Sequence, residues 1–374
     1  MQPYSRSDFG VHPLMFYYET TQACDLVCKH CRASAQENAA DDELSTELAR
    51  RLIDQVASFP RKPNIVFTGG DPLKRTDLFE LIRHAVLREL SVALTPSATP
   101  LATFEAFERA KNAGVQAFGI SLDGSTAAVH DSFRGFEGSF GKTLEMLANA
   151  RQLGIPVQVN TSLTRRNYAL LDDIAELLGD VGGVMMWSVF FLVPVGRGLE
   201  EERITAEEYE MVFAKLWQFS KEKPFAVKTT EAPHYRRFVL RQGANPLDVP
   251  RPFRFAKGEM SGPYSKTRHR APLGVTDGRG IMFVSHRGEI CPAGFLPLVC
   301  GRFPEDSVVD VYQRHSVFTA LQNPDNYKGI CGQCEYRFVC GGSRARAYAV
   351  TGDYLEAEPD CCYHVGQDAM YVGQ

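Results

Sequence analysis

Between residues 14 and 198, stretches typical of buried strands alternate with stretches typical of amphipathic helices. Continuous apolar or β-branched runs at 14–18, 64–68 and 184–191 predict strands covered on both faces. The segment after Ser45 carries apolar residues at helical spacing, at Leu48, Leu52, Ile53 and Val56. Six strand–helix units of this kind predict an α/β fold in which outer helices surround a parallel sheet.

Two of the predicted helices end at glycine. Gly114 and Gly154 each follow a helical segment and precede a strand directly, which suits a left-handed helix terminus. In parallel α/β sheets, ligands bind at the carboxyl ends of the strands, so we expect candidate chemistry there. The pattern alone does not separate an open six-stranded partial barrel from a closed eight-stranded one.

The character of the sequence changes after Gly198. One amphipathic helix is predicted from its apolar residues Tyr209, Val212, Phe213, Leu216 and Phe219. From Pro250 to Pro272 there are six Lys or Arg residues against one acid, Glu259. This basic segment is interpreted as a bridge or as a cavity wall for an anionic partner, with a solvated loop as the alternative. The predicted domains are a core over 1–198, a bridging region over 199–270 and a C-terminal domain over 271–374.

Composition narrows the function classes. The chain has 374 residues, of which 44% are apolar and 23% charged, with a formal net charge of −4. This balance gives no case for binding nucleic acid or an anionic membrane surface. No apolar run reaches membrane-spanning length, and the N-terminus lacks the layout of a signal peptide. Ten cysteines then indicate metal ligation in a reducing compartment, which predicts a cytoplasmic protein.

Three cysteines directly after the first predicted strand carry the strongest chemical signal. Cys24, Cys28 and Cys31 have the spacing C-x3-C-x2-C. Three thiolates can hold three irons of a 4Fe–4S cluster and leave the fourth iron open to an outside ligand. The alternatives are a zinc site or unrelated buried thiols. A closed zinc site needs four ligands, and no fourth Cys or His ligand lies close by in the sequence.

This triplet resembles that of the radical S-adenosylmethionine (radical SAM) superfamily. The resemblance implies a partial (β/α)6 barrel and an open iron chelated by S-adenosylmethionine. It also implies reductive cleavage to a 5′-deoxyadenosyl radical, with an electron donor such as flavodoxin or ferredoxin. A second match is Gly69-Gly70-Asp71-Pro72 at the end of the next strand. There the glycines allow a close backbone approach, and the acid can accept a hydrogen bond from the methionine ammonium. The family more often has Glu at the position of Asp71.

Further strand ends extend the resemblance. In similar proteins the segment Phe118–Gly124 faces the ribose and carboxylate of S-adenosylmethionine, so Ser121 and Asp123 are candidate contacts. Arg134 resembles an arginine that pairs with the methionine carboxylate, and a guanidinium suits this planar anion. Asn160 ends the following strand and is a further candidate. The alternative for each is a strand-end residue that caps a helix.

A second cysteine set lies near the C-terminus. Cys331, Cys334 and Cys340 have the spacing C-x2-C-x5-C, and either Cys361 or Cys362 completes four ligands. Four cysteines also suit a zinc ribbon. The order of motifs is similar to the SPASM extension of radical SAM enzymes, which implies one auxiliary 4Fe–4S cluster with Cys361 as the fourth ligand.

The chain departs from a full SPASM domain at two places. A further cysteine is expected four residues after Cys340, where this chain has Arg344. Cys291 resembles a ligand of another auxiliary cluster, and Cys300 is a possible partner, but two cysteines do not supply four ligands. We therefore expect one auxiliary cluster, with Cys291 and Cys300 as buried or reactive thiols.

The segments 341–353 and 292–297 resemble the radical SAM enzymes of alternative heme and d-type heme biosynthesis. That group alters propionate side chains of iron tetrapyrroles or siroheme derivatives, which implies a small anionic substrate. Hydrogen abstraction beside a carboxylate, followed by electron removal, could use the auxiliary cluster as the acceptor. Arg236, Arg237 and the basic segment would then pair with carboxylates. His234 and Asp277 are catalytic candidates, each with a structural role as the alternative.

Two other functions stay open. SPASM domains are common in enzymes that modify peptides, and the twenty-three residues before Cys24 are too few for a leader-recognition domain. A non-catalytic electron-transfer or sensor protein with two clusters is the alternative from another class. An open iron beside Gly69-Gly70-Asp71 argues against that alternative.

Overall fold

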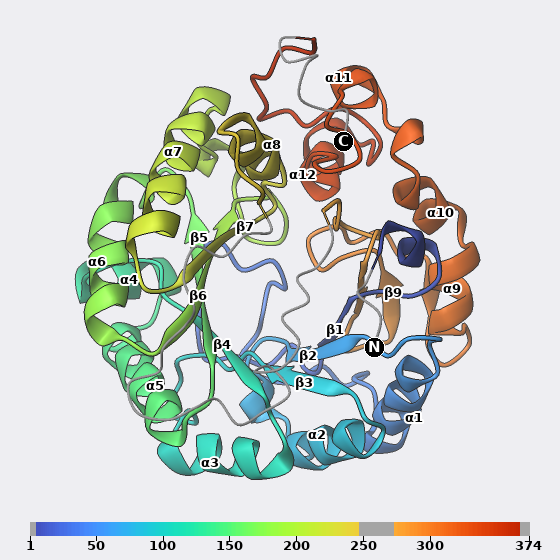
Figure 1. Ribbon diagram of the computed structural model, residues 1–374. Helices are drawn as coiled ribbons and strands as arrows, with labels where there is room; N and C mark the ends of the chain where they lie inside the picture. Colours follow the sequence, from blue (N-terminus) through green and yellow to red (C-terminus); the bar gives the residue numbers. More distant parts are fainter. Residues whose placement is uncertain (1–4, 247–272, 367–374) are drawn as a thin grey trace.

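The computed structural model describes residues 5–246 and 273–366. Within these residues one sheet runs in the order β10-β9-β8-β1-β2-β3-β4-β5-β6-β7 (Figure 1). Its strands from β8 through β1 to β7 are parallel, and β9 and β10 continue it antiparallel. The bounds are β1 Met15–Glu19, β2 Asn64–Thr68, β3 Ser91–Leu94, β4 Ala117–Ser121, β5 Val157–Leu163, β6 Val184–Phe191, β7 Ala226–Thr230, β8 Ile281–Val284, β9 Glu289–Cys291 and β10 Gly301–Arg302.

Helices cover the outer face of the curved sheet (Figure 1). Between the strands they are α1 Thr46–Ala57, α2 Leu78–Leu87, α3 Phe104–Ala113, α4 Ala127–Arg134, α5 Ser139–Leu153, α6 Leu171–Val181 and α7 Ala206–Glu222. Ser45 caps α1 by accepting a hydrogen bond from Leu48 N, as its position predicted. Gly114 and Gly154 end α3 and α5 in the left-handed conformation, with φ of 105° and 70°. Both predicted termini are confirmed.

The main core lies between the sheet and these helices. Phe16, Ile65 and Phe67 on the strands are fully buried against the apolar face of α1. On the opposite side Trp187 of β6 packs against Phe219 of α7, with ring centroids 5.9 Å apart. Burial of each such side chain contributes about 1.5–3 kcal/mol. The sheet therefore has one face committed to the helices, and its other face lines a lumen.

The partial barrel of parallel strands is confirmed, and two strands extend it. The six predicted strands are β1 to β6, but β7 adds to β6, and β8 pairs with β1 on the opposite edge. Among the described strands β7 and β8 do not pair with each other, so the barrel is open between them. The sheet thus runs across the boundaries predicted at residues 198 and 270.

The structure also contains shorter helices. They are α8 His234–Arg241, α9 Val308–Arg314, α10 Ser316–Gln322, α11 Gly329–Gln333 and α12 Arg344–Thr351, with short 3-10 helices η1 Arg6–Gly10, η2 Pro72–Lys74, η3 Tyr168–Leu170, η4 Glu200–Glu202 and η6 Pro324–Asn326. Figure 1 shows α12 next to α8, with α9 and α10 on the flank that carries β9. The C-terminal part therefore faces the lumen beyond β7.

Candidate functional site

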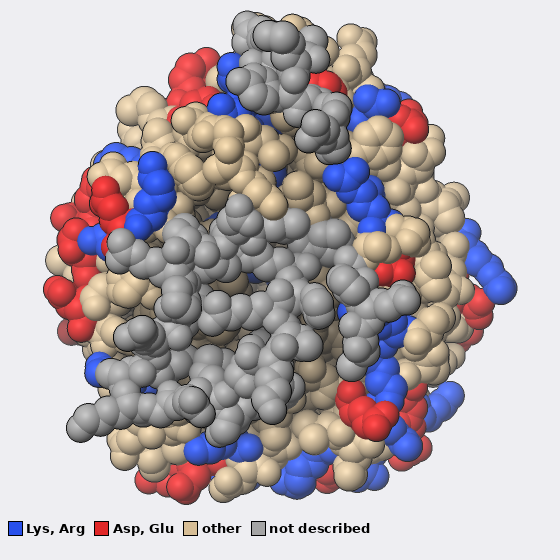
Figure 2. Space-filling view, viewed as in Figure 1, with Lys and Arg blue, Asp and Glu red and all other residues tan. Residues whose placement is uncertain are grey.

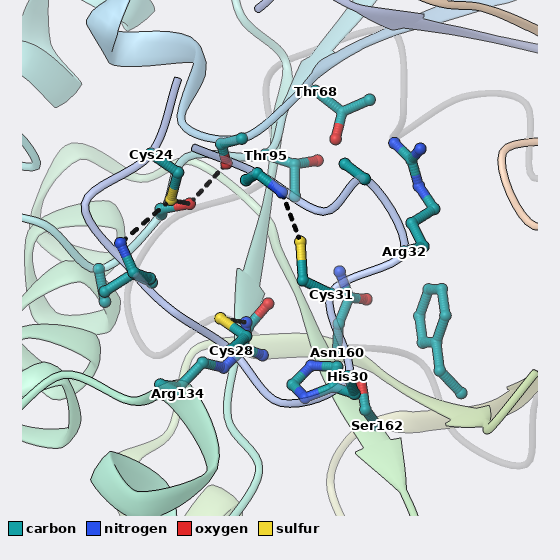
Figure 3. Close-up of a pocket in the computed structure, with 18 of the residues that line it drawn as sticks. Cys24, Cys28, His30, Cys31, Arg32, Thr68, Thr95, Arg134, Asn160 and Ser162 are labelled. Atoms are coloured by element: carbon teal, nitrogen blue, oxygen red, sulfur yellow. Dashed lines mark hydrogen bonds between the residues drawn. The ribbon is translucent and has the colours of Figure 1, made fainter. Parts of the chain in front are cut away.

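A cavity of about 190 Å³ lies at the carboxyl ends of the parallel strands. The predicted triplet of Cys24, Cys28 and Cys31 lines it together with residues from several strand ends. Figure 3 shows the three cysteine side chains around one space, with Asn160 and Ser162 below and Thr95 above. The structure therefore brings the triplet and the strand-end motifs to one site, as the sequence predicted.

The loop that carries the triplet is held by close backbone contacts. A Cβ at Gly70 would lie 2.4 Å from Ala23 O, and a Cβ at Gly196 would lie 2.4 Å from Cys31 O. Only glycine fits either position, and Gly196 also has a positive φ of 63°. The loop is therefore pressed between the ends of β2 and β6.

Arg197 adds a second restraint that the sequence interpretation missed. Its backbone N–H donates to Cys31 O, its Nε donates to Cys28 O at 2.8 Å, and its Nη1 donates to Ala35 O at 2.9 Å. These three bonds close the loop from the far end of β6. The sequence separation of 169 positions between Cys28 and Arg197 explains why local sequence patterns gave no signal for this contact.

Each sulfur of the triplet accepts a hydrogen bond. Leu26 N donates to Cys24 Sγ at 3.4 Å, Ala35 N donates to Cys31 Sγ at 3.4 Å, and Arg134 Nη1 donates to Cys28 Sγ at 3.8 Å. Such donors stabilise thiolate ligands of an iron–sulfur cluster. Burial raises the pKa of Cys24 to about 11, so iron must displace a proton from this thiol. This donor set fits a 4Fe–4S cluster.

A single-metal site fits less well. Among residues 5–246 and 273–366, no three His, Cys, Asp or Glu side chains converge on a point that could hold one metal ion. Zinc needs its sulfur ligands at about 2.3 Å, which requires such convergence. A cuboidal cluster holds its thiolates further apart than a single zinc ion does.

The glycines and the acid of the Gly69-Gly70-Asp71 motif lie in different surroundings. Gly69 and Gly70 line the cavity, but Asp71 is fully buried and does not. The Asp71 carboxylate accepts hydrogen bonds from Leu73 N, Ser97 N and Thr99 Oγ1. The direct contact predicted for Asp71 does not fit this geometry. Its carboxylate instead positions the loop after β3, and the glycines present backbone to the cavity.

Asp123 and Arg134 form a buried ion pair. Arg134 Nη2 lies 2.6 Å from Asp123 Oδ2, and Asp123 Oδ1 accepts from Ser162 N. Burial raises the pKa of Asp123, and the adjacent Arg134 opposes that rise. Arg134 lines the cavity beside Cys28, whereas Asp123 does not line it. The arginine fits the predicted contact to a cosubstrate carboxylate, and Asp123 holds it in place.

Ser121 and Asn160 line the cavity as predicted. Other lining residues were missed, among them Arg32, Ser162 and Phe190. Ser162 lies two residues after Asn160, so the two-residue period of strand β5 could have found it. Arg32 Nη1 pairs with Glu19 at 2.8 Å, and His286 Nδ1 lies 2.7 Å from the other oxygen of that carboxylate. Only the fold brings His286 to this place.

The second cysteine set surrounds a cavity of about 30 Å³. Cys331, Cys334, Cys340 and Cys361 line it, and Cys362 does not. Cys362 Sγ lies instead 3.7 Å from Ala206 O at the start of α7. This orientation supports the choice of Cys361 as the fourth ligand.

Sulfur atoms of this set also accept hydrogen bonds. Glu358 N donates to Cys331 Sγ at 3.3 Å, Tyr336 N to Cys334 Sγ at 3.4 Å, and Gly342 N to Cys340 Sγ at 3.4 Å. Arg344 Nη2 donates to Cys331 Sγ at 3.7 Å. The residue that replaces the expected further cysteine is thus a donor to a candidate ligand. Four thiols with such donors fit a fully ligated cluster.

The two catalytic candidates, His234 and Asp277, do not line the first cavity. His234 stacks on Tyr209 with ring centroids 5.1 Å apart and lines the second cavity. Burial lowers the pKa of His234 to about 3, so the ring is neutral. Asp277 is buried, accepts from Ala345 N at 3.0 Å and shares a hydrogen bond with Glu231. These positions favour structural roles for both.

Cys291 and Cys300 are neighbours: Cys291 ends β9, and Cys300 directly precedes β10. Cys300 N donates to Ile290 O at 2.8 Å, and both thiols are buried. Burial raises the pKa of each thiol, and neither thiol lines the two cavities described above. This placement agrees with a pair of buried thiols rather than with ligands of another cluster.

Two predicted partners of an anionic substrate have other contacts. Arg237 is buried and forms an ion pair with Glu210, while Arg236 donates to Val275 O and Val339 O. The basic segment from Pro250 to Pro272 lies outside the described residues. On the face shown in Figure 2, the described cationic and anionic side chains are interspersed around the periphery. No helix in the described part of the chain has the length and apolarity needed to cross a membrane.

Comparison with known proteins places these features in a wider group. The sequence model of the radical SAM superfamily matches residues 18–178. The chain is 38% identical to the "AdoMet-dependent heme synthase" of Methanosarcina barkeri, over 95% of this chain and 98% of that one. It is 40% identical to a protein of the same name from Oleidesulfovibrio alaskensis, over 92% of this chain and 86% of the relative.

A solved structure shares the fold. Streptococcus suis SuiB bound to S-adenosylmethionine superposes with a TM-score of 0.69 at 13% identity, over 94% of this chain and 78% of that one. At this identity the likeness concerns the architecture alone.

Proposed function

The chain belongs to the radical SAM superfamily, and from this premise we propose that it is an enzyme that oxidatively decarboxylates a propionate side chain of an iron tetrapyrrole. The observation that carries this proposal is the cavity at the strand ends, where a cysteine triplet faces a space that it does not fill. The relatives named heme synthase, which match almost the whole chain, support the substrate class.

The family implies a 4Fe–4S cluster and S-adenosylmethionine, and we assign Cys24, Cys28 and Cys31 as the cluster ligands. When bound, this cluster supplies the electron that cleaves S-adenosylmethionine, and an auxiliary cluster offers an acceptor for the electron that the substrate loses. Arg134 holds the cosubstrate carboxylate, because it is fixed by Asp123 at the edge of the cavity. Gly69 and Gly70 admit its methionine group, and Ser121 and Asn160 offer polar contacts on the strand ends.

The second cysteine set has a different role in this proposal. Cys331, Cys334, Cys340 and Cys361 hold one auxiliary 4Fe–4S cluster in a SPASM-like domain. The small volume of their cavity and the complete set of four thiols leave no place for a substrate atom. The domain boundaries at residues 198 and 270 stay a prediction, and the sheet is continuous across both of them.

The reaction balances with one hydrogen atom and one electron removed. A propionate loses a hydrogen atom from the carbon next to the ring to 5′-deoxyadenosyl, and its carboxylate then leaves as CO₂. The remaining electron passes to the acceptor, and a vinyl group remains. Each such conversion replaces a propionate of the iron tetrapyrrole by a vinyl group, as found in heme. An external donor of the flavodoxin or ferredoxin class supplies the reducing electron.

The test is an anaerobic assay with reconstituted, dithionite-reduced protein, S-adenosylmethionine and Fe-coproporphyrin III. We expect 5′-deoxyadenosine, CO₂ and a tetrapyrrole lighter by the elements of formic acid for each propionate converted. Formation of 5′-deoxyadenosine with an unchanged tetrapyrrole would refute the substrate and direct attention to peptides. Absence of 5′-deoxyadenosine in the presence of a full cluster would refute the enzymatic assignment altogether.

A further inference from the structure

The lumen contains one lysine whose position follows from the strand register. Ser121 pairs with Asn160, Asn160 pairs with Ser188, and Ser188 pairs with Lys228 across β4 to β7. Paired residues of parallel strands point to the same side of a sheet. Ser121 and Asn160 line the catalytic cavity, so Lys228 faces the same lumen from β7.

Two contacts confirm this orientation. Ser188 Oγ and Thr230 Oγ1 lie 3.1 Å apart, which places Thr230, and with it Lys228 two residues earlier, on the lumen side. Trp187, between the lumen-facing positions of β6, points outward to Phe219 and Phe225 instead. Lys228 therefore does not belong to the layer between sheet and helices.

Lys228 has no anionic partner among the described residues. Other lysines of intermediate or low exposure are paired, such as Lys74 with Asp25 and Lys223 with Glu176. The acid closest in sequence, Glu231, instead accepts from Ser343 Oγ and shares a hydrogen bond with Asp277. Lys228 is partly buried, and a lysine in such a position is ordinarily paired because an uncompensated charge is costly to withdraw from water.

The charged neighbour that acts on Lys228 is another cation, Arg236. Its guanidinium donates only to the carbonyl oxygens of Val275 and Val339 among the bonds described. Burial, and to a lesser degree Arg236, lowers the pKa of Lys228 to about 8. Two cations that meet without a carboxylate create a region of positive potential inside the lumen, which favours an anion.

We propose that Lys228 is the binding residue for one carboxylate of the substrate, on the lumen side of β7. The inference rests on the proposed function, because the tetrapyrrole supplies the carboxylate. Val339, which accepts from Arg236, directly precedes the candidate ligand Cys340. The bound carboxylate thus lies on the side of the lumen that leads to the second cysteine set. Lys228 positions the ring and takes no part in bond breaking.

The experiment compares the wild-type protein with Lys228→Met, Lys228→Arg and the control Lys215→Met, all anaerobic and with both clusters reconstituted. Lys215 is surface-exposed and paired with Asp172, so Lys215→Met controls for the loss of a lysine outside the lumen. Fe-coproporphyrin III and its tetramethyl ester are titrated by absorbance. Iron and sulfide contents of each variant establish that the protein is intact.

We expect Lys228→Met to weaken binding of the acid by about tenfold or more, since an ionic hydrogen bond is lost. The tetramethyl ester has no carboxylate that the Lys228 amine could bind, so the wild type and Lys228→Met should bind it with equal affinity. Lys228→Arg should recover most of the affinity, and Lys215→Met should match the wild type.

Two results would overturn the inference alone: unchanged affinity of Lys228→Met for the acid, or an equal loss for acid and ester. The second result would indicate a general distortion of the lumen. Failure of the wild-type protein to bind Fe-coproporphyrin III is a distinct outcome that overturns the proposed function, and the inference with it.

Discussion

The two cysteine sites of this protein use the same side chain in opposite settings. The first has three thiols at the edge of a cavity of about 190 Å³, and the second has four thiols around about 30 Å³. Both provide hydrogen bonds to sulfur at similar distances, so these donors do not distinguish them. The difference lies in ligand number and free volume. Under the proposed function, the open site engages the cosubstrate and the closed site exchanges electrons only.

The sites also differ in how the fold holds them. The first loop is fixed by the ends of strands far apart in sequence, through Gly70, Gly196 and Arg197. The second is fixed by charges buried beside it. Arg346 has no exposed surface and pairs with Glu358 at 3.0 Å, and Glu358 N donates to Cys331. The first site therefore depends on loops that follow strands far apart in sequence, and the second on a buried polar network in which Arg346 also donates to the carbonyl oxygens of Phe191, Leu192 and Glu231.

The comparison can be tested most strongly at the first site. Cys28→Ala should abolish formation of 5′-deoxyadenosine, because the open cluster loses one of its three ligands. About half of the iron and acid-labile sulfide should remain, held by the second set. Iron analysis and chromatography of the reaction mixture measure both quantities. Full iron content in this variant would show that the triplet is not a ligand set.

The converse change is Cys340→Ala. It should also reduce iron by about half, yet the protein should still cleave S-adenosylmethionine when dithionite is present. Conversion of Fe-coproporphyrin III should be lost, since no acceptor remains for the second electron. Parallel assays of 5′-deoxyadenosine and of tetrapyrrole product separate the two effects. Normal product formation in this variant would contradict the proposed role of the second site.

A smaller effect is expected when the buried network is broken without removing a ligand. Arg346→Met leaves Glu358 buried without its partner, which should cost about 3–5 kcal/mol of stability. Thermal unfolding followed by circular dichroism should show a large fall in Tm. The double variant Arg346→Met with Glu358→Gln should recover part of the loss, because it leaves no uncompensated charge. Equal Tm values for the wild type and the single variant would show that the pair does not support the fold.

The sequence was informative where chemistry and local pattern coincide. Strands β1 to β6 and the place of the triplet after the first strand follow from the apolar runs, whereas Ser121 and Asn160 were candidates through the resemblance to radical SAM proteins. Strand β7 was missed because its lumen face carries Lys228 and Thr230, so it lacks an apolar run. The pairing of β8 with β1 joins segments more than 250 residues apart, and no local pattern reports it.

The same limit applies to the site. Asp71 has the right type and place in sequence for a ligand contact, but its carboxylate is fully buried and accepts hydrogen bonds from three internal donors. Arg344 was interpreted as a missing cysteine, whereas its guanidinium donates to Cys331. In both cases the partner of the side chain is set by tertiary contacts, which the sequence pattern does not show.

The smallest predicted effect concerns the space between the two sites, where Lys228 lies. Its pKa of about 8 in the folded protein is below the value of about 10.4 in an unfolded chain. Between these values the unfolded chain binds more protons, so stability should rise as the pH increases from about 8 to 10. Lys228→Met removes this contribution. The variant should therefore be the more stable protein at pH 7, and its advantage in Tm should shrink toward pH 10.

Tm measured at pH 7, 8, 9 and 10 for the wild type, Lys228→Met and Lys215→Met checks this expectation. The control should follow the wild type across the range, because Lys215 is exposed. A constant offset between the wild type and Lys228→Met would mean that the amine is not perturbed in the folded protein. Saturation with Fe-coproporphyrin III should flatten the difference, since a bound carboxylate restores the ordinary pKa of the amine. This last measurement tests whether the Lys228 amine binds the carboxylate of the tetrapyrrole in the lumen.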